Sequence, residues 1–290
     1  MVASVKQAFA VALSAMSMAV GAGQECVVLS SGSGISFAHY ENDTLQFDTA
    51  LLKGSSLLNP VWPSYSKSMG VLVFEARDNG HHGIYKANAE GFFQNSELLM
   101  PGRYPALSPD GDKIAYFNEH NNLAIKDIRF GTGMLIDESY DNLSVWKRPL
   151  WINNNELIYI TKKEEVFIFK ISEKSHSRLI SEKLFPVASS DGAILFLDHD
   201  ARTLFEYKAG KLNVVFKNRF LSMGPGVVML KDGFLYSRQT WSEVLQLSEA
   251  QAIFYFRRDS RSEKELVSHL SLFGGSLLPC DLIKDYAFKE

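Results

Sequence analysis

Histidine and acidic side chains that could perform metal or acid–base chemistry are scattered along this chain. The histidines come closest together in Asp78-Asn79-Gly80-His81-His82-Gly83, where two imidazoles and one carboxylate could contact a transition metal. No third ligand follows at a fixed spacing, so a solvated hairpin loop between two strands is the favoured interpretation. We therefore predict no metal site and no cofactor.

A second grouping, Asp198-His199-Asp200, places an imidazole beside carboxylates, as in a general base and the group that orients it. Its position between two predicted strands favours a simple polar turn. A nucleophile elbow of the G-x-S-x-G type is also missing, because Gly32-Ser33-Gly34 is too short and follows no strand-to-helix pattern. No catalytic residue is assigned from the sequence.

The elements that carry these residues are predicted to be short strands. Aromatic residues make up 12% of the chain, and many lie in β-branched runs that favour an all-β fold. Five prolines recur at intervals of about 37 to 45 residues, and each is followed by a polar or glycine-containing turn and an apolar strand. These prolines are Pro60, Pro105, Pro149, Pro186 and Pro225.

Each repeat reads as a four-stranded antiparallel meander, and the chain ends together supply one more. Segment 24–58 contains up to three strands, and the tail adds at least one around 277–288. Pairing both ends in one sheet would close a ring and leave only short edges. We therefore predict a six-bladed β-propeller of four-stranded antiparallel blades. Segment 241–251 is predicted to be an insertion of one or two helical turns in the fifth unit.

Residues 1–23 have the layout of a secretory signal peptide, with Lys6 before an apolar run of small residues. That run, about 15 residues long, is shorter than the roughly 20 residues needed to span a bilayer. We expect cleavage to leave a single domain, 24–290, that has no membrane span and is periplasmic or secreted. In that compartment Cys26 and Cys280 are expected to form a disulfide, and two unrelated buried thiols are the alternative.

Segment 103–116, Arg-Tyr-Pro-Ala-Leu-Ser-Pro-Asp-Gly-Asp-Lys-Ile-Ala-Tyr, resembles the repeat of TolB-type six-bladed propellers. That repeat has an apolar strand, Ser-Pro-Asp-Gly, one or two polar residues and a second strand. Segments 190–192 and 231–233 keep only the Asp-Gly turn. The resemblance implies the propeller fold, which also occurs in a periplasmic docking protein and as a gating domain on peptidases. It covers the propeller alone and implies no specific partner.

Charge and position indicate what such a propeller would bind. The net charge of −3 offers no positive excess for a phosphate backbone, so nucleic acid is not a predicted partner. Residues just before the repeat prolines are expected near one mouth of the channel, where Arg148 could bind a carboxylate between Tyr104 and Phe185. As a set they would not coordinate a hard cation, and the favoured interpretation is that they simply fill the channel. The positions are Asn59, Tyr104, Arg148, Phe185 and Gly224.

Trp62 and Trp151 follow the prolines at equivalent positions and are predicted to lie in the core between blades. Trp241 lies in the insertion and is a candidate for an exposed apolar lip, unless that segment folds back onto its blade. The sequence thus predicts a monomeric, non-catalytic binding or scaffold protein whose partner is a protein or peptide. The alternative is a lactonase- or cyclase-like propeller enzyme, which would need at least three acidic, amide or histidine side chains converging in the channel.

Overall fold

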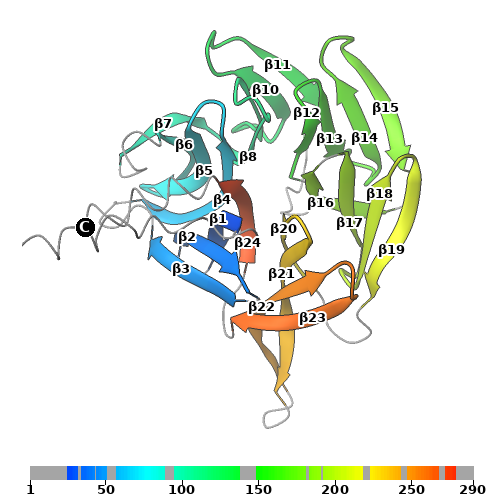
Figure 1. Ribbon diagram of the computed structural model, residues 1–290. Helices are drawn as coiled ribbons and strands as arrows, with labels where there is room; N and C mark the ends of the chain where they lie inside the picture. The colour runs from blue at the N-terminus through cyan, green and yellow to red at the C-terminus, as the bar shows by residue number, and fades with distance from the viewer. Residues whose placement is uncertain are drawn as a thin grey trace, which may run out of the picture.

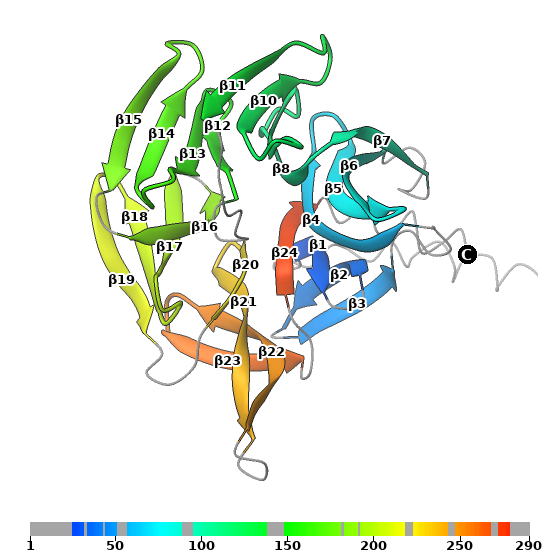
Figure 2. The ribbon, with the colours of Figure 1, turned by 180° about the vertical axis from the view of Figure 1, so that it is seen from behind.

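Six four-stranded antiparallel sheets stand around a central axis in the computed structural model of this protein (Figures 1 and 2). The innermost strands of neighbouring blades contact one another around the ring. The predicted six-bladed, all-β propeller is therefore confirmed. The structure describes residues 25–278, except for 32–33, 43, 51–56, 89–94, 138–147, 181–182, 191, 218–222, 243–246 and 268–271.

Five blades consist of consecutive strands, named here from the innermost outward. They are β4 (Leu58–Ser66), β5 (Val71–Asp78), β6 (His81–Asn88) and β7 (Ser96–Pro101); β8 (Arg103–Leu107), β9 (Lys113–Phe117), β10 (Leu123–Asp127) and β11 (Gly133–Asp137); β12 (Leu150–Asn153), β13 (Glu156–Ile160), β14 (Val166–Lys170) and β15 (Ser175–Ile180); β16 (Leu184–Ser190), β17 (Ala193–Asp198), β18 (Thr203–Lys208) and β19 (Lys211–Lys217); and β20 (Met223–Met229), β21 (Gly233–Ser242), β22 (Leu247–Arg257) and β23 (Ser262–Val267).

The sixth blade joins the two ends of the chain. Its strands, from the innermost outward, are β24 (Leu272–Leu278), β1 (Glu25–Ser31), β2 (Gly34–Glu41) and β3 (Thr44–Ala50). Figure 1 shows β24 in red beside the blue strands, and Cys26 pairs with Leu278 in the antiparallel ladder. The predicted closure of the ring by both chain ends is thus confirmed.

The closing strand begins at Leu272, five residues before the predicted segment 277–288. The sequence concealed this start because two glycines, Gly274 and Gly275, interrupt the apolar pattern. The structure shows why glycine suits position 275: a Cβ there would come within 2.6 Å of side-chain atoms of both Leu29 and Val228. Glycine lets the backbone of β24 lie close to its neighbours near the axis. The rest of the predicted strand, 279–288, lies outside the described residues.

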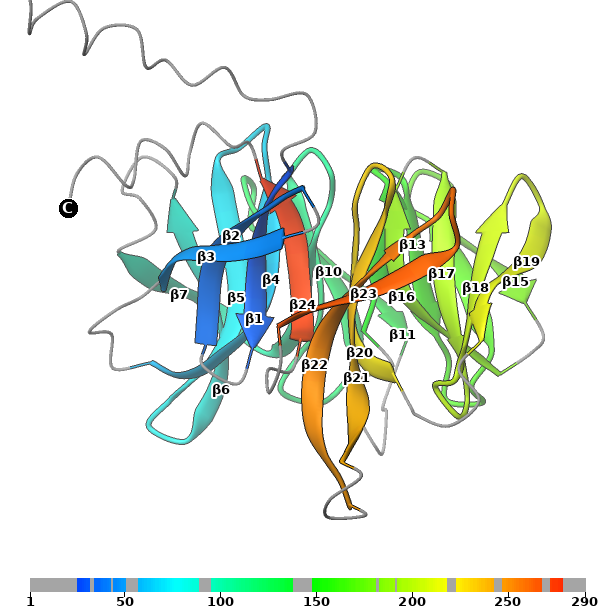
Figure 3. The same ribbon diagram turned by 60° about the horizontal axis from the view of Figure 1, so that its bottom comes forward.

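The insertion in the fifth unit forms strands where helical turns were predicted. It lengthens the hairpin of β21 and β22, which projects beyond the body of the propeller (Figure 3). The ladder continues through Gln239 and Gln251 to Thr240 and Ala250. The backbone N–H and C=O groups of this hairpin form hydrogen bonds with the facing strand. They therefore do not need the internal hydrogen bonds of a helix. Trp241 lies in β21, while residues 243–246 lie outside the described part.

The hydrophobic core lies between neighbouring blades. Trp62 and Trp151 are almost fully buried in one apolar cluster that also contains Tyr104, Phe117 and Tyr159. The prediction that both tryptophans belong to the core between blades is confirmed. Within the described ranges, no helix has the length and apolar character needed to cross a membrane.

Candidate functional site

A cavity of about 350 Å³ occupies the central channel. Most of its lining lies where the innermost strand of a blade turns into the second strand, and we call this side of the ring the inner-turn face. Its described lining is apolar or hydroxyl-bearing apart from two cations, Lys67 and Arg148. No carboxylate or imidazole is among the lining residues, which are Pro63, Ser64, Tyr65, Lys67, Ala106, Leu107, Ser108, Pro109, Arg148, Leu150, Trp151, Val187, Ala188, Ser189, Ser190, Val227, Val228, Met229 and Gly275.

Hydrogen bonds between blades hold the wall of this cavity. The backbone N–H of Leu107 donates to Ser64 Oγ at 3.0 Å. The indole Nε1–H of Trp151 donates to the carbonyl of Ala106 at 2.8 Å, and Ser189 Oγ–H donates to the carbonyl of Trp151 at 2.6 Å. These three bonds connect β4, β8, β12 and β16 in turn, so the lining is held before any ligand arrives.

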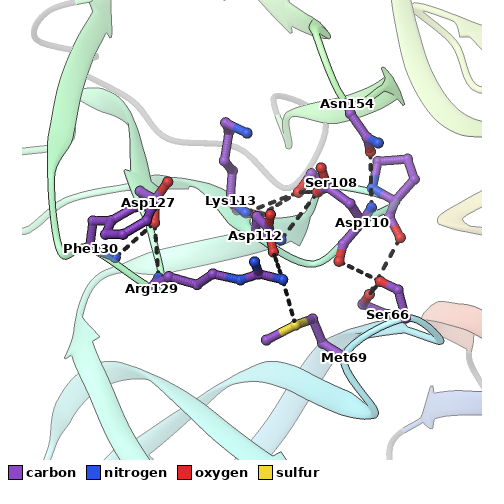
Figure 4. Close-up of polar contacts among 12 residues, drawn as sticks. Ser66, Met69, Ser108, Asp110, Asp112, Lys113, Asp127, Arg129, Phe130 and Asn154 are labelled. Atoms are coloured by element: carbon purple, nitrogen blue, oxygen red, sulfur yellow. Dashed lines mark hydrogen bonds and ion pairs between the residues drawn. The ribbon is translucent and has the colours of Figure 1, made fainter.

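The Ser-Pro-Asp-Gly turn between β8 and β9 forms part of the rim (Figure 4). Ser108 Oγ–H donates to Asp110 Oδ1 at 2.5 Å and accepts the backbone N–H of Lys113 at 3.0 Å. Gly111 closes the turn with a φ of +79°, and its N–H donates to the carbonyl of Ser108 at 2.8 Å. Serine, aspartate and glycine are therefore each required by the geometry of the turn.

The same turn also connects three blades. The backbone N–H of Asp110 donates to Asn154 Oδ1 of the next blade at 2.9 Å (Figure 4). On the other side, Ser66 Oγ–H donates to the carbonyl of Pro109 at 3.3 Å. Arg129 adds an ion pair with Asp112 at 2.7 Å. The motif that carries the TolB resemblance thus positions the cavity rim and contributes no reactive group.

Arg148 is the charged residue of the predicted set that lines the cavity. It lies two residues before β12, and its Cζ is 5.2 Å from the centroid of the Trp62 ring, in a cation–π contact. Burial lowers the pKa of Arg148 to about 10. The guanidinium is still protonated at neutral pH, and no carboxylate in the described part of the chain pairs with it. The cavity therefore contains a partly buried cation, and the described residues provide no carboxylate to pair with it.

The other predicted binding residues do not gather around the channel. Asn59 and Tyr104 line a separate pocket of about 250 Å³ on the opposite face, and the side chain of Tyr104 is buried in the core. Phe185 is also buried, with its ring 6.1 Å from that of His199. Positive φ values of +50° at Asn59 and +52° at Tyr104 accompany irregular strand pairing, which redirects the two side chains. Binding by these residues stays a prediction.

The remaining two predicted positions are described by their backbone alone. Gly224 lies in β20 and Trp241 in β21. Among the positions before the prolines, Arg148 thus lines the central cavity, whereas Asn59 and Tyr104 line the other pocket. A residue's place before proline does not by itself determine the direction of its side chain.

The second pocket contains a charge cluster that sequence reasoning missed. Glu75 is 3% exposed, and its Oε1 lies 2.6 Å from His82 Nδ1 and 3.5 Å from Arg103 Nε. Its Oε2 accepts the backbone N–H of Tyr104 at 2.9 Å, while Arg77 Nε–H donates to His82 Nε2 at 3.1 Å. The prediction of a solvated loop is therefore wrong for His82. The sequence did contain a signal for this cluster, because Glu75 lies inside an apolar run, 71–76, and a buried glutamate requires partners.

Burial, followed by the charge of Arg103, lowers the pKa of His82. The imidazole is then neutral at pH 7, with the Nδ1 proton directed to Glu75 and Nε2 accepting from Arg77. Because Glu75 bonds to the backbone of the next blade, this cluster joins two blades. In this cluster Glu75 supplies a carboxylate to His82 and Arg103, whereas no described carboxylate pairs with Arg148.

The other histidine grouping is the polar turn that the sequence predicted. Asp198 Oδ1 accepts the backbone N–H groups of Arg202 at 2.7 Å and Thr203 at 3.1 Å, and His199 is exposed. In the part of the chain that the structure describes, no three His, Cys, Asp or Glu side chains group in a way that could hold a metal ion.

No protein-family model and no curated protein matches this chain. Solved structures do, among them TolB from Acinetobacter baumannii, with a TM-score of 0.64 and 11% identity over 89% of this chain and 67% of that one. The fold is that of a TolB-like propeller. A chain from a nidogen/laminin complex matches with a TM-score of 0.60 and 10% identity, covering 88% of this chain and 98% of its own. An oligogalacturonate lyase in complex with manganese matches with a TM-score of 0.50 and 11% identity, covering 85% of this chain and 73% of its own. At these identities the likeness concerns the fold alone.

Proposed function

We propose that this protein is a non-catalytic binding module of the cell envelope or secreted space that takes a carboxylate-bearing segment of a protein or peptide into its central cavity. The observation that carries the proposal is Arg148. Arg148 is partly buried beside apolar side chains, and no carboxylate among the described residues offsets its charge, which is unfavourable away from bulk water. A ligand carboxylate would supply the counter-ion, and a guanidinium can bind it through two parallel hydrogen bonds.

The rest of the cavity suits a polypeptide segment. Its volume of about 350 Å³ is within the range of ordinary ligand sites. The lining combines alanine, valine and leucine side chains with serine residues, so both the apolar and the amide parts of an extended peptide would find contacts. The hydrogen bonds between blades hold these groups in place, which reduces the entropy cost of binding.

Binding is favoured over catalysis because the described lining has no activated nucleophile. The hydroxyls of Ser64, Ser108 and Ser189 are engaged with backbone groups or with the turn carboxylate of Asp110, and none contacts an imidazole. Nucleophilic serine chemistry needs an adjacent base. The lactonase-type alternative needs several convergent metal-ligating side chains, and no lining residue supplies a carboxylate or imidazole.

Three further features support the location and the class of partner. Residues 1–23 resemble a signal peptide, and one structural neighbour comes from a nidogen/laminin protein complex. Cys280 follows two residues after Leu278, the ladder partner of Cys26. We therefore keep the Cys26–Cys280 disulfide, the monomeric state and export of the chain as parts of the proposal.

The experiment is a selection of random peptides displayed on phage against the mature protein. We expect enriched peptides to carry an acidic side chain or a free C-terminal carboxylate. Arg148→Gln should weaken their affinity at least about tenfold, while Arg148→Lys, which keeps the charge, should retain part of it. Arg178→Gln, an exposed position on β15, is the matched control and should change nothing. Peptides that bind Arg148→Gln as tightly as the unaltered protein would refute the proposal.

A further inference from the structure

A second cavity, of about 290 Å³, lies beside the central one on the inner-turn face. Ser190 and Met229 line both cavities, so the two adjoin. The second cavity lies between the blade of β16–β19 and the blade of β20–β23, with Glu25 at the start of β1 on its third side. Its charged lining residues are Glu25, Lys208, Lys231 and Arg258.

Arg258 follows the end of β22 and presents an incompletely satisfied guanidinium. Its Nη1 forms an ion pair with Glu206 Oε1 of the neighbouring blade at 2.8 Å. Among the described residues its Nε and Nη2 have no hydrogen-bond partner, and both atoms are shielded from solvent. These two nitrogens carry the parallel N–H groups of one edge of the guanidinium, which is the edge that binds a carboxylate through two bonds.

Side chains of both charges surround the cavity. Lys208, at the end of β18, pairs with no carboxylate in the described part of the chain. The carboxylate of Glu25 accepts the backbone N–H of Lys231 at 2.7 Å. Glu206 is engaged with Arg258. Asp232 also lies close enough to Glu25 to raise its pKa, so the feature that distinguishes this cavity is the buried edge of Arg258, because a buried donor without an acceptor is unfavourable.

We infer that this cavity is a second anion site, which binds another acidic side chain of the same partner segment whose first carboxylate pairs with Arg148. The inference rests on the proposed function and makes the partner more specific. The partner segment would carry at least two acidic groups, one for each cavity, with Ser190 and Met229 between them. The Nε–Nη2 edge of Arg258 receives the second carboxylate as the side chain turns toward the cavity.

Two capped peptides test this by calorimetric titration: hexaglutamate, and a glutamine hexapeptide with one central glutamate. Arg258→Gln should weaken the binding of hexaglutamate at least about tenfold and leave the single-glutamate peptide unchanged. Arg148→Gln should weaken both peptides. Because Arg258→Gln also removes the partner of Glu206, Lys208→Gln is a second variant, expected to weaken hexaglutamate several-fold. Arg261→Gln, exposed in the same turn as Arg258, is the matched control.

The outcomes separate the two ideas. Hexaglutamate binding that is unchanged in both Arg258→Gln and Lys208→Gln overturns the second site and leaves the proposed function standing. Loss of hexaglutamate affinity in these variants, with no effect of Arg148→Gln on either peptide, supports the second site and overturns the proposed central one. If hexaglutamate does not bind the unaltered protein at millimolar concentration, both are overturned.

Discussion

Replacing Gly111 by alanine tests how the Ser-Pro-Asp-Gly turn holds the cavity rim. Gly111 has a φ of +79°, a backbone conformation that L-residues with a Cβ adopt at a cost of about 1–2 kcal/mol. The new Cβ would also overlap Ser66 Oγ and lie 2.7 Å from Met69 Cγ, both atoms of the adjacent blade. Two separable effects are therefore expected: backbone strain and overpacking.

The overpacking contributes about 1–3 kcal/mol, because Ser66 is buried and cannot move away freely. Alanine offsets about 0.4–1 kcal/mol of the total by restricting the unfolded chain. We expect Gly111→Ala to lower the free energy of unfolding by about 2–4 kcal/mol. This is a large share of the stability of an ordinary domain, which is about 5–15 kcal/mol.

Gly192 provides the matched control within the same chain. It has a φ of +73° in the equivalent Asp-Gly turn between β16 and β17, and a Cβ added there would have nothing within 4 Å. Gly192→Ala should therefore show the backbone strain alone, about 1 kcal/mol. The difference between the two variants isolates the contact between blades.

The assay is equilibrium unfolding in urea, followed by tryptophan fluorescence and by far-ultraviolet circular dichroism, with the slope of the transition compared among the three proteins. If the two variants lose the same free energy within about 0.5 kcal/mol, the packing of the turn against Ser66 and Met69 does not stabilise the ring, and the reasoning fails.

Further predictions concern single contacts. Trp151→Phe removes the indole donor to the buried carbonyl of Ala106 and should lower the free energy of unfolding by about 1–3 kcal/mol in the same assay; a loss below about 0.5 kcal/mol would contradict the bridge. Burial raises the pKa of Glu25, so its ionisation opposes folding and stability should fall as pH rises through that pKa. Glu25→Gln, which keeps an oxygen for the Lys231 N–H, should be more stable than the unaltered protein at pH 7 and equal to it below the unfolded pKa; a pH-independent difference would argue against this. Thiol titration of the unfolded, unreduced mature protein should find no free thiol, whereas two per chain would exclude the Cys26–Cys280 disulfide.

The sequence alone predicted the architecture because blade formation depends on local pattern. Prolines about 40 residues apart, apolar alternation and Asp-Gly turns specify strands and tight connections within each meander. The ring closes because the segments left over at the two ends amount to one more blade. The sequence pattern failed at β24, where two glycines weaken the local signal for a strand. It also failed at the hairpin of β21 and β22, where the local signal is compatible with either strands or helical turns.

The candidate site was less accessible to sequence reasoning. Arg148 was identified from its place before a proline, yet Asn59 and Tyr104 at equivalent places line another pocket, because positive φ values turn the backbone there. A strand pattern with a period of two does not indicate such irregularities.

Tertiary structure alone decided the charge pairs. Glu75 and Tyr104 belong to neighbouring blades, as do Glu206 and Arg258, and each pair is separated by tens of residues in the chain. The packing of one blade on the next determines which buried charge finds a partner. Among the described residues, it gives Glu75 three partners, no carboxylate to Arg148 and no acceptor to one edge of Arg258. Because the energy of a buried charge depends on its spatial neighbours, composition and spacing could not distinguish these residues.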